Sequence, residues 1–494
     1  MNRGVERALR RVRDHPLLRE VAQVAAERDL LPVYLVGGFV RNALLKGPEG
    51  LDIDLVSPEP ASLGAALRHA FAGRLIGFAE GVHRVVFSRR GKRVQVDIAP
   101  LRGESIVEDL RCRDFTINAL GISLSQDPPE LIDPTGGLRD LREKQIRVGG
   151  PQVLAEDPLR LLRSVRLAAQ LSFAIGETTA QAIRQHAPLL GRVAPERLRE
   201  EFFGILNSSV AGRWLTAMDD LRLLEVLLPE TRGMRGCLQG PPHRFDVLTH
   251  SLETVRSLDG ILNRLPKLFS RQAALLIGSL KAEVEGGISR QALLRFAALL
   301  HDVGKPETRS TEEGRIRFLD HAERGAGIAE GICHRLRLGS RASAMAVTLV
   351  REHLRPFFLE QAKTITPGAR YRFWRDLGPL AADCLILSLA DIRATYGREG
   401  RAFCARLRFV QEMLAFQRKR IRVGRYTGGR ASLVDGHELM ARMDLTPGPF
   451  VGFLLERLQE EAAIGSLRTK EEALRYLRRH LHALRGEFER GGAP

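Results

Sequence analysis

The most informative pattern in the N-terminal part of the chain is YLVGGFVRNALLKGPEGLDIDLVSPEP, residues Tyr34 to Pro60. A short apolar run ends in two glycines, a helix-like segment follows, and two aspartates then flank Ile53. Because side chains alternate across a strand, Asp52 and Asp54 share one face while Ile53 and Leu55 share the other. The stretch therefore predicts a strand, a tight turn and a second strand that presents two carboxylates together.

A third carboxylate is expected from the segment RVVFSRRGKRVQVDIAP, residues 84–100. Two β-rich runs around Arg-Arg-Gly-Lys predict a hairpin, with Asp97 on the polar face of its second strand. If that strand lies beside the strand of Asp52 and Asp54, three carboxylates converge. Carboxylate oxygens are ligands that Mg²⁺ accepts, and paired ions of this kind activate an attacking hydroxyl and stabilise a leaving phosphate.

The two glycines, Gly37 and Gly38, complete this pattern. Without a Cβ atom, the backbone amides of the turn can approach a triphosphate. Strand, double glycine, helix start, paired aspartates and an isolated strand aspartate together match the layout of a nucleotidyltransferase palm. The expected catalytic residues are Asp52, Asp54 and Asp97, with Mg²⁺ bound by Asp52 and Asp54.

Composition limits the class of protein. The chain has 494 residues, 44% hydrophobic and 27% charged, which predicts several globular domains. No apolar run is long enough for a membrane span, and the charged N-terminus lacks the pattern of a signal peptide. The five cysteines are scattered and form no CxxC pair, so we expect no disulfide framework and a cytoplasmic protein. The net charge of +17 favours a nucleic-acid partner, the alternative being arginine used as a general surface cation.

The order of patterns predicts an α+β protein whose small mixed sheet is followed by helical regions. Helical periodicity dominates from Pro151 onward, and EDPLRLLRSVRLAAQL predicts a helix with Asp157 as its N-cap. The expected parts are an N-terminal helix and palm at 1–150, an all-α neck at 151–235, an all-α histidine-containing domain at 236–398, and a basic run with a helical tail at 399–494.

Four further segments resemble, in order and spacing, the class II tRNA nucleotidyltransferase and bacterial poly(A) polymerase family. These segments are EDLRCRDFTINAL at 108–120, DPTGGLRDL at 133–141, EDPLRLLRSVRLAAQLSF at 156–173 and APERLREEFF at 194–203. Members of this family add nucleotides to an RNA 3′ end without a template. The resemblance implies nucleotide-binding roles for Gly37, Gly38, Arg41, Arg113, Asp114, Asn118, Asp157, Arg160 and Arg163.

The pair Asp157 and Arg160 would read the incoming base. A carboxylate accepts from an exocyclic amine while a guanidinium donates to the neighbouring acceptor, which admits C and A and refuses U and G. The chain departs from the family pattern at Asn42, where Asp is usual, and at Cys112, where Arg is usual. We expect the first change to loosen the anchoring of Arg41 and the second to remove a phosphate contact.

A second group of residues resembles an HD phosphohydrolase domain of the kind found in enterobacterial-type members. Ionisable side chains recur there within apolar helical patterns, where they are costly unless paired or bound to metal. The HD pattern is made by His250, His301, Asp302 and Asp391, and His321 and His353 fall where some HD domains hold a second metal. The resemblance implies hydrolysis of phosphoesters with Ni²⁺, Mn²⁺ or Co²⁺. The alternatives are a scaffold without activity and histidines at 321 and 353 that bind no metal.

The leading hypothesis is a nucleotidyltransferase that builds or repairs the tRNA CCA end from CTP and ATP, or part of that end. The alternatives are a general poly(A) polymerase and an RNA-binding HD phosphohydrolase with an inactive transferase head. The chain between Asp97 and Arg113 is short, which in this family is a feature of members that add only C; the alternative is that another segment carries the switch to A. The basic run from Arg418 to Arg430 and the helical tail after it are expected to bind RNA.

Overall fold

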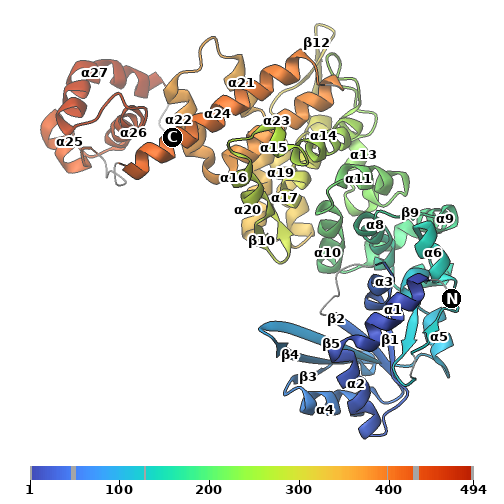
Figure 1. The fold of residues 1–494 in the computed structure, drawn as a ribbon. Helices are drawn as coiled ribbons and strands as arrows, with labels where there is room; N and C mark the ends of the chain where they lie inside the picture. The colour runs from blue at the N-terminus through green and yellow to red at the C-terminus, as the bar shows by residue number, and fades with distance from the viewer. Residues whose placement is uncertain (1–2, 46–51, 127–128, 398, 427–432, 491–494) are drawn as a thin grey trace. The chain divides into compact units, whose positions relative to one another are not determined.

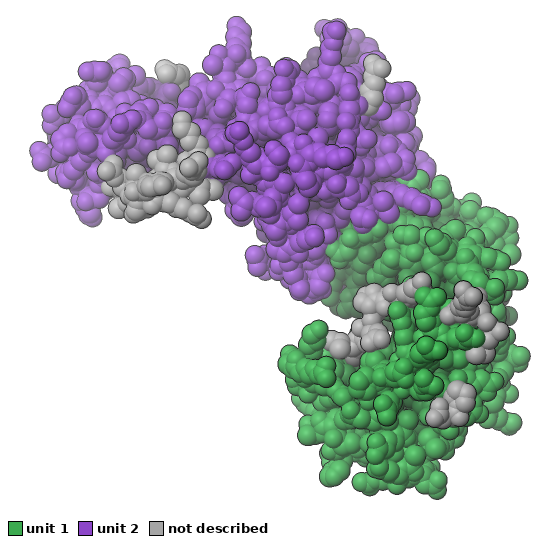
Figure 2. Space-filling view, viewed as in Figure 1, with its two compact units in different colours: residues 1–208, 214–229 green, residues 209–213, 230–494 purple. Residues whose placement is uncertain are grey.

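The structure is a computed structural model, and it describes residues 3–45, 52–126, 129–397, 399–426 and 433–490 (Figure 1). The chain divides into two compact units, coloured separately in Figure 2. The head unit comprises residues 1–208 and 214–229, and the HD unit comprises residues 209–213 and 230–494. The finer division into four parts stays a prediction.

The head unit is built on a seven-stranded mixed sheet with the strand order β3-β4-β5-β2-β1-β6-β7. Only β2 and β5 pair in parallel, and the other neighbours are antiparallel. The predicted hairpin is formed by β4 and β5, and it buries Val94, Val96 and Ile98 on one face. The strands are β1 (Tyr34–Val36), β2 (Asp52–Ser57), β3 (Arg74–Gly77), β4 (His83–Arg89), β5 (Lys92–Pro100), β6 (Gly121–Ser123) and β7 (Leu131–Ile132).

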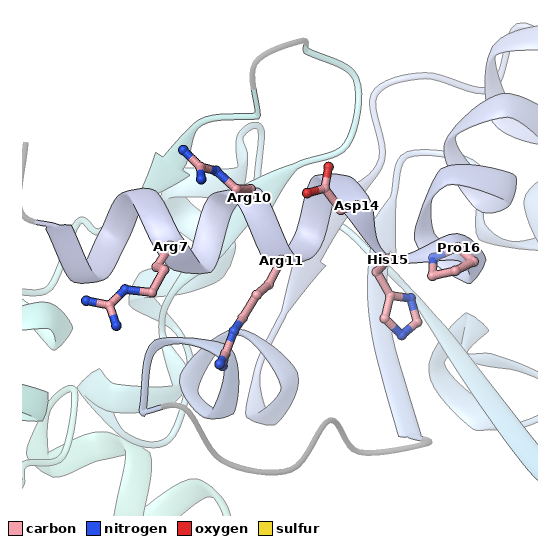
Figure 3. A pocket seen from close by; sticks show the side chains of 6 residues that line it. All are labelled: Arg7, Arg10, Arg11, Asp14, His15 and Pro16. Atoms are coloured by element: carbon pink, nitrogen blue, oxygen red, sulfur yellow. The ribbon is translucent and has the colours of Figure 1, made fainter.

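The predicted N-terminal helical segment forms α1 (Arg3–Asp14) and α2 (Pro16–Glu27). Helix α1 packs against α3 (Gly38–Leu45) and buries Ala8 and Val12. Its arginine-rich side is open to solvent and helps to form a shallow pocket of about 360 Å³ (Figure 3). The pocket is lined by Arg7, Arg10, Arg11, Asp14, His15 and Pro16.

Helices complete the head unit after the sheet. The base-reading segment differs from its prediction by one position: α7 (Pro151–Glu156) ends before Asp157, and α8 (Leu159–Leu171) begins after Pro158. Asp157 still caps α8, because its Oδ1 accepts a hydrogen bond from the Leu159 amide at 3.3 Å. Helix α8 packs against α10 (Pro195–Leu206). The other helices here are α4 (Pro60–Ala70), α5 (Ile106–Arg111), α6 (Gly137–Glu143), α9 (Glu177–His186), α12 (Leu224–Leu227) and, from Trp214 onward, α11 (Ala211–Asp220).

The HD unit is helical as predicted, with two small hairpins in addition. Strands β10 (Glu283–Glu285) and β11 (Ile288–Ser289) join at Gly286 and Gly287, and β12 (Arg309–Glu312) and β13 (Arg315–Phe318) join at Glu313 and Gly314. All four turn residues have positive φ, as two-residue hairpin turns of type I′ require. The main helices are α14 (Val247–Leu262), α17 (Arg290–Leu300), α19 (His321–Arg335), α20 (Ser340–Glu352) and α23 (Ala381–Tyr396).

The C-terminal helices have a core of their own around Leu439, Leu454 and Leu477. In the predicted basic run, the side chains of residues 419–432 lie outside the described part of the structure. Among the described residues, no helix combines the length and the apolar character needed to cross a membrane. The helices here are α24 (Arg401–Tyr426), α25 (Gly436–Met443), α26 (Pro449–Ala463) and α27 (Lys470–Arg490).

Candidate functional site

The head unit places the three predicted carboxylates on two neighbouring strands. In the parallel register of β2 and β5, Asp54 lies opposite Asp97 and Asp52 lies opposite Gln95. Gln95 Nε2 donates a hydrogen bond to Asp52 Oδ1 at 3.2 Å. Burial raises the pKa of Asp54, and the charges of Asp97 and Asp52 raise it further. The three carboxylates concentrate negative charge, which makes Asp54 harder to ionise. A divalent cation bound to their oxygens would stabilise the charged form.

The glycine turn lies directly against this cluster. Gly37 has a φ of +73°, and a Cβ atom at this position would stand 2.9 Å from Asp54 Oδ2. Any other residue would therefore combine backbone strain with a clash against the carboxylate. The turn leads into α3, so that helix begins next to the carboxylate of Asp54.

The cluster also contains a residue that the sequence interpretation missed. Arg84 on β4 pairs with Asp97 on β5 through both carboxylate oxygens, with Nε 2.6 Å from Oδ1 and Nη2 2.8 Å from Oδ2. Both residues are partly exposed. The third carboxylate thus already has a cationic partner from the protein.

Arg41 is held by two amide side chains. Its Nη1 donates to Asn118 Oδ1 at 2.7 Å, and its Nε and Nη2 donate to Asn42 Oδ1 at 3.2 and 3.1 Å. Asn42 thus contacts this arginine through its amide oxygen, and the expectation that it holds Arg41 more loosely than an aspartate would stays a prediction. Burial and the charge of Arg166 lower the pKa of Arg41.

The predicted sugar- and base-ordering residues connect the sheet to α8. Asn118 Nδ2 donates to Asp114 Oδ1 at 3.3 Å, and Arg163 Nη1 on α8 lies 3.3 Å from Asp114 Oδ2. Arg163 Nε also donates to the buried Glu201 on α10 at 3.3 Å, and Arg166 Nε donates to the same carboxylate at 2.5 Å. Burial opposes the charge of Arg163, but Asp114 and Glu201 outweigh it and raise the pKa of this arginine.

Arg113 and the short connection before it are fixed by an aspartate that the sequence interpretation also missed. Asp109, 2% exposed, accepts from Arg113 Nε at 3.0 Å and from the Arg102 amide at 3.3 Å. Only residues 101–105 separate β5 from α5. Cys112, at the second departure from the family pattern, is exposed.

The two predicted base-reading residues are each held by a different partner. Asp157 Oδ2 accepts from Arg197 Nη2 at 2.9 Å. Arg160 Nη1 donates to the Val153 carbonyl at 2.8 Å and lies 3.5 Å from Glu156 Oε2. The sequence interpretation gave no role to Arg197, which pairs with this carboxylate, or to Glu156, which lies near the guanidinium.

In the HD unit, all six predicted residues meet at one buried centre. Asp302 lies in its middle: Oδ2 is 3.1 Å from His301 Nε2 and 3.7 Å from His250 Nε2, and Oδ1 is 3.4 Å from His321 Nε2 and 3.6 Å from His353 Nε2. Asp391 on α23 completes the group, with Oδ1 3.0 Å from His250 Nε2. The ligand atoms form two sets that could each hold a metal ion and that share Asp302.

Backbone contacts orient three of these histidines for ligation. The Nδ1 atoms of His301, His321 and His353 lie 2.7 to 2.9 Å from the carbonyls of Ala298, Phe318 and Val350. In the neutral form of each ring, a proton on Nδ1 would leave the Nε2 lone pair free for a metal, as in metal-binding histidines. Burial and the charge of His301 lower the pKa of His353 to about 3, which keeps this ring neutral. The donor set therefore fits divalent metal.

Three polar residues next to this centre had no predicted role. Lys305 Nζ lies 2.6 Å from Asp302 Oδ2 and donates to Gln239 Oε1 at 2.7 Å. Burial alone would raise the pKa of Asp302, but the neighbouring His301 and Lys305 outweigh this effect and hold the pKa well below its usual value. His243 packs edge-on against His250, with ring centroids 5.0 Å apart. The HDVGK spacing could have indicated Lys305, whereas Gln239 and His243 come from a loop without a clear pattern.

Comparison with known proteins agrees with this geometry. Family models match residues 33–147 as a poly(A) polymerase head domain, 172–234 as a probable RNA- and SrmB-binding site of polymerase A, and 247–396 as an HD domain. Head and HD domains of these kinds generally use divalent metals.

Curated relatives cover nearly the whole chain. It is 35% identical over 454 residues to an A-adding tRNA nucleotidyltransferase of Deinococcus radiodurans, covering 90% of this chain and 94% of the relative. It is 34% identical over 448 residues to a CC-adding tRNA nucleotidyltransferase of Geobacter sulfurreducens, covering 90% and 91%. A solved CCA-adding enzyme with CTP shares the fold with a TM-score of 0.65 at 22% identity, covering 97% of this chain and 98% of that one. The chain therefore belongs to the tRNA nucleotidyltransferase family that carries the poly(A) polymerase head domain.

Proposed function

We propose that this protein adds all or part of the CCA sequence to the 3′ end of tRNA without a template, using CTP and ATP and releasing pyrophosphate. The observation that carries the proposal is the parallel pairing of Asp54 with Asp97 beside the Gly37 turn. Three carboxylates and a Cβ-free turn at one place suit the transfer of a nucleotide from a triphosphate.

The residues of the head unit divide this work. Asp52 and Asp54, with Asp97, would hold Mg²⁺, which when bound favours attack by the RNA 3′-hydroxyl on the α-phosphate and stabilises the leaving pyrophosphate. The Gly37–Gly38 amides and Arg41 face the triphosphate, and Arg41 is oriented for this by Asn42 and Asn118. Arg113, Asp114 and Asn118 order the sugar and base.

The base is read on α8. Asp157 accepts from the exocyclic amine of C or A, and Arg160 donates to the adjacent ring nitrogen. Arg163, on the same helix, forms an ion pair with Asp114. This pair connects the base-reading residues on α8 to the sugar- and base-ordering residues beside the sheet. Uracil and guanine present a carbonyl where the carboxylate needs a donor, and they are refused.

The short connection after β5 supports addition of only part of the sequence. Residues 101–105 are ordered by the Asp109 contact and by a hydrogen bond from the Glu104 amide to Glu108 Oε2 at 2.7 Å, which leaves little room for a flexible switching loop. Relatives of both partial types match at similar identity, one A-adding and one CC-adding. The short connection favours the CC-adding type for this chain.

Staged substrates test this proposal. Purified protein is incubated with tRNAs ending before the first C, after one C and after CC, each with single nucleotides, and products are resolved at one-nucleotide length. Addition of two C residues followed by a stop is the expected result. Addition of A to a tRNA ending in CC overturns the CC-only assignment, and long A tracts on unrelated RNAs would favour the poly(A) polymerase alternative.

A second activity is favoured by the histidine centre. Six candidate ligands, three of them histidines oriented by backbone carbonyls, exceed what a purely structural domain requires, so we propose that the HD unit hydrolyses phosphoesters such as 2′,3′-cyclic phosphates with a transition metal. His250, His301, Asp302 and Asp391 would hold one ion. Asp302, His321 and His353 would hold the second.

A further inference from the structure

We propose that Arg84 is a built-in cation that occupies Asp97 when no metal is bound and that competes with divalent ions for this carboxylate. The inference rests on the proposed transferase function of the head unit. Arg84 would thereby raise the metal concentration that the three carboxylates need to bind a divalent ion. The sequence pattern predicts this role for no residue.

The position of Arg84 supports this assignment. The register of β4 and β5 places Arg84 directly opposite Asp97, which in turn lies opposite Asp54 on β2. The guanidinium fork takes one N–H to each oxygen of Asp97, the arrangement in which an arginine satisfies a carboxylate most fully. A metal ion approaching Asp97 must therefore share or displace these hydrogen bonds.

The guanidinium also lies next to the rest of the cluster. Its partner Asp97 lies opposite Asp54 on β2, and Asp52 stands two residues before Asp54 on the same face of that strand. The charge of Arg84 thus compensates the same three carboxylates that a divalent ion would neutralise. Two cations at this place repel each other, so binding of the ion weakens the arginine contact.

The ion pair between Arg84 and Asp97 is weak enough for a divalent ion to replace the arginine. The side chains are 36% and 31% exposed, and an ion pair this open to solvent is weak. The guanidinium already lies 5.1 Å from the centre of the Phe78 ring, and Phe78 is 49% exposed. An aromatic face offers the released guanidinium an alternative contact through a cation–π interaction.

A second arginine on the same strand provides the matched control. Arg89 makes a comparable two-contact pair with Glu20 on α2, at 2.9 and 2.6 Å. This pair joins β4 to a helix and involves none of the three carboxylates. Removing Arg89 costs the strand a similar ion pair without changing the charge at the metal site.

The experiment measures metal binding directly on the full-length protein. Tb³⁺, a hard ion that prefers oxygen ligands, is titrated by its luminescence and then displaced with Mg²⁺, for the wild type, Arg84→Gln, Arg89→Gln and Asp54→Asn. We expect Arg84→Gln to bind both ions on the order of five- to tenfold more tightly, since a neighbouring positive charge has been removed. Arg89→Gln should match the wild type, and Asp54→Asn should lose the signal.

Unchanged or weaker binding by Arg84→Gln would show that Arg84 only supports Asp97, and would overturn the inference. If this variant does not fold, Arg84→Lys keeps the charge but lacks the fork and should bind the ions with a smaller gain. Nucleotide addition gives a second readout: Arg84→Gln should reach half-maximal rate at a lower Mg²⁺ concentration. A wild type that adds no nucleotide to any tRNA would refute the transferase proposal, while the titration would still decide the role of Arg84.

Discussion

Asp52 and Asp54 differ in environment although they share one face of β2. Asp52 is exposed, whereas Asp54 lies against the Gly37 turn and beside Asp97. Replacing either aspartate with alanine should abolish nucleotide addition, because metal is required for chemistry, and should leave tRNA affinity within a few-fold. Single-turnover incorporation and filter binding check the two parts. Incorporation retained by both variants would refute the assignment of the metal ligands.

Asp157 and Arg160 are the proposed base-reading residues. Changing either residue to alanine should relax discrimination against UTP or GTP by about tenfold or more, since a paired base contact is worth about 1–3 kcal/mol. Metal binding should persist, because neither side chain lies on β2 or β5. Competition assays with pairs of nucleotides measure the effect. If both variants keep a strict preference for C and A, the base is read by other residues.

The sequence indicated the proposed catalytic groups more readily than the side chains that pair with them. Asp52, Asp54 and Asp97 follow from strand periodicity and from recurring motifs. Arg84 and Glu201 act through partners that become neighbours only when strands or helices pair, and many arginines in this chain could have filled such a role. Which carboxylate an arginine pairs with depends on the tertiary structure, so the sequence pattern alone does not identify it.

Helices α14 and α17 are joined by a buried ion pair. Arg295 is 1% exposed, its Nε donates to Asp259 Oδ1 at 2.7 Å, and Asp259 Oδ2 accepts from the Gly212 amide at 2.8 Å. Arg295→Ala should lower the free energy of unfolding by about 3–5 kcal/mol, because it leaves a buried carboxylate without its cation. Denaturation with urea, followed by circular dichroism, measures this change.

The same variant should show a pH dependence of defined sign. Burial already raises the pKa of Asp259, and loss of Arg295 raises it further. A carboxyl whose pKa is higher in the folded state than in the unfolded state binds more protons when folded, so stability falls as the pH rises above its unfolded value. The deficit of Arg295→Ala should therefore be smaller at pH 5 than at pH 8, and Asp259→Asn with Arg295→Met should remove this difference. An equal deficit at both pH values would contradict the assignment.

Elements with a long or regular pattern were predicted, and short ones were not. The β4–β5 hairpin and α8 follow from alternating and helical periodicity. Strands β10 to β13 contain only two to four residues each within a helical region, which is too short for a period to emerge. The start of α8 was misplaced by one position because Asp157 and Pro158 both favour a helix start, and only the hydrogen bonds distinguish their positions.

The division of the whole chain could not be read from its linear order. Residues 209–213 belong to the HD unit although the residues on both sides belong to the head unit. The contact that helps to fix this assignment is the hydrogen bond from Gly212 to Asp259, between residues distant in sequence. Composition changes little across these residues, so no linker signal marks the crossing.

Each proposed activity lies within one compact unit, and this predicts that the two can be removed separately. His301→Ala deletes an Nε2 ligand from the buried centre and should reduce hydrolysis of 2′,3′-cyclic nucleotides on the order of 100-fold or more, while nucleotide addition survives. Asp54→Ala is the reciprocal control, because it should abolish addition and leave hydrolysis intact. Both reactions are assayed on the same preparations with Ni²⁺, Mn²⁺, Co²⁺ and Mg²⁺ in turn. Absence of hydrolysis by the wild type with every ion would favour a scaffold role for the HD unit, and loss of both reactions in a folded His301→Ala protein would show that the two sites depend on each other.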